Sequence, residues 1–186
     1  ETIINGFKVL GSINELLQID YNLEVVISIA DPMIKKKIYE TLNSNSFLSF
    51  PSIIHPNVLI GSDDVIVGYG CIICASNIIT VNVSIGNFVI LNLGCTVGHD
   101  TRIGDYCSFM PAVNISGEVI IENSVYVGTG AKIINLLTIG MISSPKIKEG
   151  MPFSRHTLFF NEYTISLYYI INKYYMPSTP STACIT

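Results

Sequence analysis

The sequence predicts a mainly β protein, built as a solenoid of short stacked strands behind a small α/β domain. Three observations predict it. Large apolar residues recur every six positions through the middle of the chain, small or apolar residues recur two positions before them, and strand-like and helix-like segments alternate in the first 52 residues. A constant period is decisive for fold class because it identifies repeat architectures.

The six-residue period is unbroken over thirteen positions. Reading every sixth residue gives Val67, Ile73, Ile79, Ile85, Leu91, Val97, Ile103, Phe109, Ile115, Ile121, Val127, Ile133 and Ile139. Hydrophobic residues make up 49% of the chain, so such a run in one frame has a chance on the order of 1 in 10⁴. The period therefore indicates a structural repeat.

The residues two positions before these thirteen form a second track, and together the two tracks show which side chains point inward. The second track is small or apolar everywhere except at Asn77, and positions i−2 and i are those that a short strand presents to one side. Glycine often follows the large apolar residue, asparagines are scattered through the same stretch, and both residue types tolerate tight corners. Each hexad thus reads as one strand plus one corner, with Ile54 and Ile60 joining after a one-residue slip. We predict a solenoid over residues 53–140.

Two other architectures fit this period less well. An up-and-down sheet has turns at irregular intervals rather than a constant six. A helix is excluded because six residues is not a multiple of its pitch.

The first domain is expected to span residues 1–52. Residues 7–11 and 24–30 have the composition of buried strands, and Ser12 with Glu15 forms a capping box that opens a short helix through Ile19. A second helix is expected to begin at Asp31-Pro32. Its apolar face contains Ile34, Ile38 and Leu42.

Residues 141–186 form an atypical C-terminal tail. The period stops after Gly140, and an aromatic run follows that polar pairs at 161–162 and 172–173 interrupt, so it is not a membrane span. An amphipathic helix and a segment without an evolved role both remain open.

Composition limits the function classes. The net charge is −4 and charged residues make up only 13% of the chain, so no basic surface is expected for nucleic acid or an anionic membrane. The five cysteines do not form a secreted disulfide framework, and no signal-peptide pattern opens the sequence. We expect a reduced, cytoplasmic protein, with further sequence upstream of Glu1.

Residues 54–140 resemble the hexapeptide-repeat acyltransferases, which are left-handed parallel β-helices with three hexads per coil. The first 52 residues resemble the N-terminal domain of one subfamily, the sialic-acid O-acetyltransferase and UDP-amino-sugar N-acetyltransferase group. That group has a further strand and glycine-rich loop before the position of Phe7, so this domain is expected to be partial. The resemblance implies a homotrimer, with acetyl-CoA as acyl donor between neighbouring subunits and no metal.

His99 is the candidate general base. It lies two residues beyond the inward Val97, on an outward corner, and the same corner one 18-residue coil later is Gly117. Acyl transfer needs a base for the acceptor's proton and a donor for the oxyanion, which His99 and the Gly117 N–H would supply. Asp100 could orient the imidazole. The subfamily motif V-x-H-[DE]-x-x-I-G is matched by Val97, His99, Asp100, Ile103 and Gly104.

The resemblance adds substrate and cofactor positions. An asparagine seven residues before the base lies near the acceptor in the family, and Asn92 occupies that position; a simple turn asparagine is the alternative. Segments that line the CoA channel in the family match Pro111-Ala112, Ser116-Gly117 and the stretch containing Gly128 and Gly130. For each of these residues, corner geometry is the alternative explanation.

Other histidines and cysteines are assigned no chemistry. His55 opens the solenoid and is interpreted as structural, and His156 lies in the tail. In Cys71-x-x-Cys74 the first thiol points inward and the second lies on the following turn, so we expect buried small residues rather than a metal site.

The function that follows is an acetyl-CoA-dependent acetyltransferase acting on an amino group or hydroxyl of a sugar or nucleotide sugar in cell-surface glycan biosynthesis. A non-catalytic remnant and a serine O-acetyltransferase-like enzyme are the alternatives. A γ-class carbonic anhydrase would need three zinc-binding histidines, and the three here are too widely spread.

Overall fold

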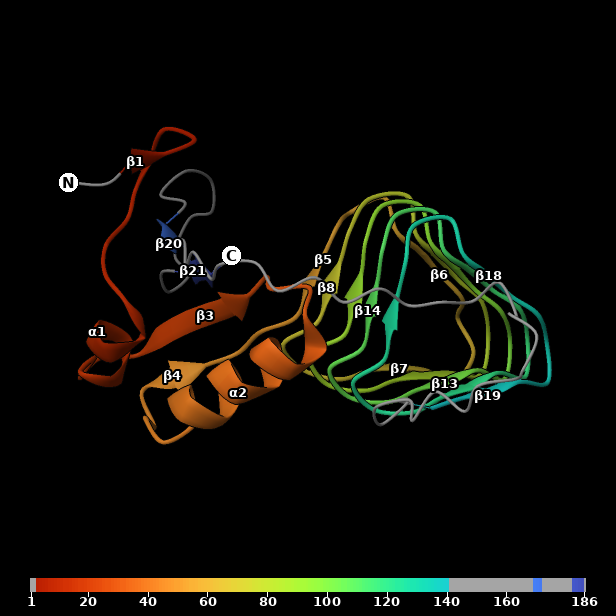
Figure 1. Ribbon diagram of the computed structural model, residues 1–186. Helices are drawn as coiled ribbons and strands as arrows, with labels where there is room; N and C mark the ends of the chain where they lie inside the picture. The colour runs from red at the N-terminus through yellow and green to blue at the C-terminus, as the bar shows by residue number, and fades with distance from the viewer. Residues whose placement is uncertain (1–2, 141–168, 172–181, 186) are drawn as a thin grey trace, which may run out of the picture.

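The computed structural model describes residues 3–140, 169–171 and 182–185 (Figure 1). A small α/β unit near the N-terminus lies beside one end of a triangular solenoid. Among the described residues, no helix is long and apolar enough to cross a bilayer.

The α/β unit is built around one short mixed sheet. β3 (Leu23–Ile27) pairs in parallel with β4 (Leu48–Ser49) on one side and with β21 (Thr182–Ile185) on the other, and β20 (Tyr169–Ile171) pairs antiparallel with β21. The helices are α1 (Ile13–Leu17) and α2 (Pro32–Leu42). The buried apolar residues of this unit include Leu16, Val25, Ile27, Ile38 and Leu42.

Side-chain caps start both helices where the sequence predicts. The Ser12 N–H donates to the Glu15 carboxylate at 2.7 Å, and the Asn14 N–H donates to the Ser12 hydroxyl at 3.3 Å. Asp31 Oδ1 accepts from two backbone amides, each at 2.9 Å. The capping box is confirmed, although α1 ends at Leu17 rather than Ile19.

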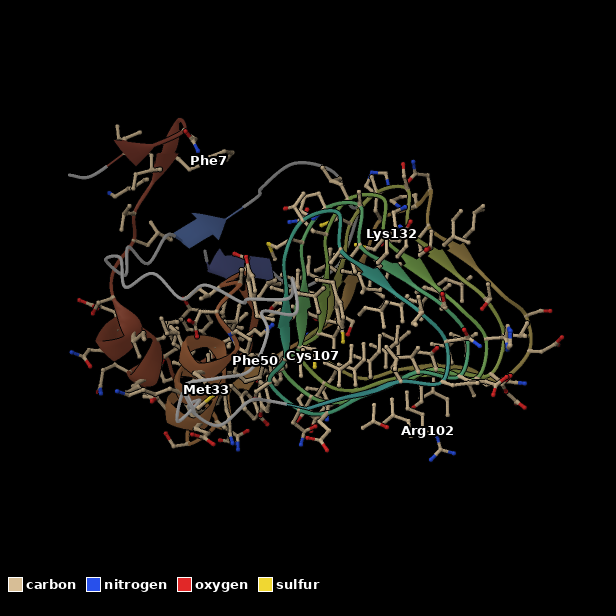
Figure 2. All side chains as sticks on the ribbon, turned by 45° about the vertical axis from the view of Figure 1, so that its right-hand side comes forward. Phe7, Met33, Phe50, Arg102, Cys107 and Lys132 are labelled. Carbon is tan, nitrogen blue, oxygen red and sulfur yellow. The ribbon has the colours of Figure 1, made fainter. Side chains whose placement is uncertain are left out.

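The predicted buried strand over residues 7–11 is wrong. β1 (Ile3–Ile4) and β2 (Phe7–Lys8) form a hairpin whose Asn5-Gly6 turn has φ of 49° and 83°, and Phe7 is exposed (Figure 2). Both edges of β3 are paired, with β4 and with β21, so residues 7–11 do not lie beside β3 in the main sheet. The predicted strand at 24–30 corresponds to β3.

The solenoid has three parallel five-stranded sheets, here called faces 1, 2 and 3. Face 1 contains β5 (Ile53–Ile54), β8 (Ile72–Ile73), β11 (Ile90–Leu91), β14 (Ser108–Phe109) and β17 (Tyr126–Val127). Face 2 contains β6 (Leu59–Ile60), β9 (Ile78–Ile79), β12 (Thr96–Val97), β15 (Asn114–Ile115) and β18 (Lys132–Ile133). Face 3 contains β7 (Val65–Val67), β10 (Val83–Ile85), β13 (Arg102–Ile103), β16 (Ile120–Ile121) and β19 (Thr138–Ile139).

Strand register gives a coil of 18 residues. Leu91 pairs with Phe109, as 18-residue spacing requires, whereas Ile54 pairs with Ile73 at a spacing of 19. The predicted one-residue slip is therefore confirmed. Both apolar tracks line the continuous interior of the prism. The chain is a left-handed parallel β-helix, and the predicted fold class is confirmed.

Asn77, the polar exception in the inward track, is fully buried and fully bonded. Its Nδ2 donates to the carbonyls of Cys74, Leu91 and Asn92 at 2.7, 3.3 and 3.0 Å, and its Oδ1 accepts from the Cys95 N–H at 3.0 Å. These bonds offset the cost of burying an amide.

The corners turn through left-handed residues at the same position in successive coils. The 1–2 corner, between faces 1 and 2, has positive φ at Ser76, Gly94, Ala112 and Gly130. The 2–3 corner has positive φ at Asp64, Asn82, Asp100, Glu118 and Leu136, and the 3–1 corner at Gly70, Phe88, Tyr106 and Ser124. Because these positions recur every 18 residues, each corner stacks equivalent residues from successive coils.

The α/β unit is anchored to the solenoid by aromatic packing and a buried lysine. Phe88, on the 3–1 corner, packs against Tyr39 and Phe50 and stacks on Tyr106 with ring centroids 5.5 Å apart. Lys35 of α2 is fully buried, and its Nζ donates to the Cys107 carbonyl at 3.2 Å and the Ser108 hydroxyl at 2.9 Å. Phe50 and Cys107 mark this junction in Figure 2.

Candidate active site

His99 and Asp100 form a hydrogen-bonded pair on the 2–3 corner, directly after β12. His99 Nδ1 lies 2.7 Å from Asp100 Oδ2, and the two side chains are 56% and 51% exposed. The Asp100 backbone has φ of 56°, a conformation that aspartate tolerates, and its N–H donates to the Val81 carbonyl at 3.2 Å. The pair is therefore presented to solvent from a fixed turn.

The pairing defines the chemistry of the imidazole. The hydrogen bond from His99, followed by one from Asn82, holds the pKa of Asp100 below its usual value, so the carboxylate stays ionised. An ionised carboxylate accepts only, so the neutral imidazole carries its proton on Nδ1 and has its lone pair on Nε2. Within residues 3–140, Nε2 has no hydrogen-bond partner. It is free to accept a proton from a ligand.

Gly117 lies one coil beyond His99, against the imidazole. A Cβ on Gly117 would lie 2.6 Å from His99 Nε2, so any larger residue would displace the ring. The Glu118 N–H donates to the His99 carbonyl at 2.8 Å and ties the two coils together. Within residues 3–140, the Gly117 N–H makes no hydrogen bond. A histidine acceptor and a free backbone donor thus lie side by side.

The other predicted site residues lie on the 1–2 corner. Asn92 directly follows β11, and its Oδ1 accepts from the Leu93 N–H at 2.8 Å. The Ala112 N–H donates to the Leu93 carbonyl and the Gly130 N–H to the Pro111 carbonyl, each at 2.9 Å. Among the described residues, no atom lies within 4 Å of a Cβ placed on Gly128 or Gly130.

One chain therefore presents two separate groups of predicted residues. His99, Asp100 and Gly117 occupy the 2–3 corner, while Asn92, Pro111, Ala112, Gly128 and Gly130 occupy the 1–2 corner, with face 2 between them. The structure does not bring Asn92 next to His99 within a single copy.

Asn82 contacts this pair and was not predicted from the sequence. Its Nδ2 donates to Asp100 Oδ1 at 3.2 Å from the preceding coil of the 2–3 corner. The signal was available, because Asn82 precedes Asp100 by one 18-residue coil.

Histidines and cysteines do not converge on a metal site in the described part of the chain. His55 lies on the 1–2 corner, two coils before His99 and on a different corner, and its Nδ1 is 2.7 Å from Asn57 Oδ1. His156 lies outside the described residues. Cys71 is buried with its Sγ donating to the Gly86 carbonyl at 3.1 Å, and burial raises its pKa and that of Cys74.

A left-handed β-helix that presents a histidine–carboxylate pair beside a bare backbone amide is the arrangement expected of hexapeptide-repeat acyltransferases. The chain is 35% identical over 131 residues to GDP-perosamine N-acetyltransferase of Escherichia coli O157:H7, covering 70% of this chain and 58% of that protein. The chain thus spans less than two thirds of this relative's length. No family model matches the chain.

Solved structures give the same assignment. WeeI from Acinetobacter baumannii AYE superposes with a TM-score of 0.68 at 30% identity, over 76% of this chain and 71% of that one. The acetyltransferase domain of PglB from Neisseria gonorrhoeae FA1090 superposes with a TM-score of 0.67 at 25% identity, over 74% and 67%, and has also been solved with acetyl coenzyme A. The chain belongs to the hexapeptide-repeat acyltransferase family.

Proposed function

We propose that this protein transfers an acetyl group from acetyl-CoA to the amino group of a nucleotide-linked sugar used in cell-surface glycan synthesis. The observation that carries the proposal is the arrangement on the 2–3 corner. His99 Nδ1 is held by Asp100 at 2.7 Å, and Nε2 lies against the bare backbone of Gly117. The acceptor class is supported by the similarity to a GDP-perosamine N-acetyltransferase.

The reaction uses both groups. The acceptor nitrogen attacks the thioester carbonyl carbon, and His99 Nε2 takes the proton that this nitrogen loses. The Gly117 N–H donates to the oxyanion of the tetrahedral intermediate. When the carbon–sulfur bond breaks, the imidazolium returns its proton to the CoA thiolate, and the products are an amide and free CoA. Asp100 stabilises the transient imidazolium and keeps the proton of the resting imidazole on Nδ1.

The two corner groups serve one site if copies of the chain associate. The 1–2 corner of one copy would meet the 2–3 corner of the next, so that Asn92 lies near the acceptor and the segments containing Pro111, Ala112, Gly128 and Gly130 line the CoA channel. Contacts between two different surfaces generate rings when the rotation closes. A homotrimer is the ring we propose. Weakly charged faces support it, because residues 65–140 contain only Asp100, Arg102, Asp105, Glu118, Glu122 and Lys132 as charged residues.

The proposed division of labour follows the fold. Residues 1–52 form the partial nucleotide-sugar domain and residues 53–140 the acyltransferase domain. The cytoplasm is the proposed compartment, which the four free cysteines of the described residues support.

The test is CoA thiol release from acetyl-CoA in the presence of nucleotide-linked amino sugars, with the matching hydroxyl sugars and serine as comparison acceptors. We expect release with an amino sugar and an acetamide product by mass spectrometry. Turnover with serine alone would indicate a serine O-acetyltransferase. No turnover with any acceptor, by protein that binds acetyl-CoA, would indicate a non-catalytic remnant.

A further inference from the structure

Asn82 holds the oxygen of Asp100 that His99 leaves free. Asn82 Nδ2 donates to Asp100 Oδ1 at 3.2 Å, while Asp100 Oδ2 is paired with His99 Nδ1 at 2.7 Å. The carboxylate is therefore bonded at both oxygens, by residues of two successive coils.

The backbone makes this contact a consequence of the coil register. Asn82 and Asp100 have φ of 54° and 56° at equivalent positions of the 2–3 corner. The Asn82 N–H donates to the Asp63 carbonyl at 3.0 Å and the Asp100 N–H to the Val81 carbonyl at 3.2 Å. Their side chains therefore leave matching turns on adjacent coils, which are about 4.8 Å apart.

An amide suits this position chemically. Asp100 is half exposed, and a carboxylate bonded at only one oxygen is free to rotate about its terminal torsion. If the amide oxygen of Asn82 faced Asp100, two hydrogen-bond acceptors would lie against each other. The NH₂ group must therefore face the carboxylate. An asparagine also stays neutral, and its hydrogen bond, after that of His99, lowers the pKa of the Asp100 carboxyl.

We propose that Asn82 is a positioning residue for acetyl transfer: it fixes Asp100, and through Asp100 it sets the Nδ1–H tautomer of His99 and the direction of Nε2. The inference rests on the proposed function. Asn82 reaches no reacting atom itself, so its effect passes entirely through the His99–Asp100 pair.

Two substitutions separate the donor from the shape of the side chain. Asn82→Gly keeps the left-handed backbone accessible and removes the amide. Asn82→Asp keeps the shape but sets a second carboxylate against Asp100. Asp64→Gly is the matched control, because Asp64 has φ of 49° at the same corner one coil before Asn82 and therefore two coils before Asp100.

Steady-state kinetics and ¹⁵N NMR of the imidazole nitrogens are the two measurements, with the His99 signals assigned by their loss in His99→Gln. We expect Asn82→Gly to lower kcat about tenfold, the effect of one lost hydrogen bond to a charged group, with little change in KM. We expect its His99 to lose its preference for the Nδ1–H tautomer. Asn82→Asp should be slower than Asn82→Gly, and Asp64→Gly should match the wild type in both measurements.

Either of two outcomes overturns the inference. If Asn82→Asp is as active as the wild type, or if Asn82→Gly leaves kcat and the tautomer unchanged, Asn82 only fills the corner. A failure of the proposed function is distinct, because the wild type would then show no turnover with any amino sugar, or His99→Gln would keep the wild-type turnover. The tautomer measurement decides whether Asn82 orients His99 even in a protein without turnover.

Discussion

His99 and Gly117 lie one coil apart on the same corner, so close that a Cβ on Gly117 would stand 2.6 Å from His99 Nε2. The spacing of 18 residues is one complete coil, and the Glu118 N–H bonded to the His99 carbonyl fixes it. A solenoid thus brings a side-chain base next to a main-chain donor without any long loop.

Gly117→Ala is expected to lower kcat by at least tenfold, and Gly117→Val by more, because each Cβ displaces the imidazole from its place beside the amide. Stability should change by less than about 0.5 kcal/mol, since the ring is half exposed and can swing outward. Turnover and urea unfolding of both variants are the measurements. Equal activity of the two variants and the wild type would contradict the proximity of ring and amide.

Asn77→Ala is expected to reduce the free energy of unfolding by about 2–4 kcal/mol, because it leaves the Cys95 N–H and the carbonyls of Cys74 and Asn92 without this partner, while the Leu91 carbonyl keeps its bond from the Cys74 N–H. Asn114→Ala is the control, since the Asn114 side chain makes one exposed bond, to the Ala112 carbonyl at 3.3 Å. Urea denaturation compares them. A similar loss in both variants would mean that the buried network adds nothing specific.

Lys35 predicts a pH dependence of stability. Burial lowers its pKa to about 7, whereas an unfolded chain has a lysine pKa of about 10.4. Above pH 7 the unfolded state therefore binds more protons at this site, and the free energy of unfolding rises with pH by at most about 1.4 kcal/mol per unit. The contribution is absent in Lys35→Met.

The measurement is urea unfolding of wild type and Lys35→Met at pH 7, 8 and 9. The stability of the wild type relative to the variant should increase across this range. Parallel pH curves would mean that Lys35 keeps its charge in the folded protein.

A stable trimer is expected at micromolar concentration. Each copy has one part of the predicted site on its 2–3 corner and the other part on its 1–2 corner, so a complete site needs two neighbouring copies. Light scattering should give three times the mass of one chain. A catalytically active monomer would contradict the division of the site between copies.

The fold was largely predictable because the hexad constrains every inward residue of the solenoid. The same arithmetic places His99 over Gly117. It also separates Asn92 from His99, since seven residues carry the chain across one whole face to the next corner. A residue-by-residue match to the family pattern does not reveal that separation, because the match carries no information on which corner each residue occupies.

Tertiary packing decided what the sequence pattern left open. A lysine on an amphipathic helix is normally solvated, but Lys35 finds acceptors at Cys107 and Ser108, on a coil some 70 residues away. Residues 7–11 are apolar enough for a strand, yet the Asn5-Gly6 turn folds them back locally. Neither outcome depends on local composition alone.

The most direct test of the account is the turnover of His99→Ala, measured beside its thermal midpoint. The side chain is exposed on a corner, so its loss should change stability by less than about 0.5 kcal/mol. Loss of a general base should slow acetyl transfer about 10²–10⁴-fold. A variant that folds normally and keeps more than about a tenth of wild-type turnover would contradict the assignment of His99 as the base.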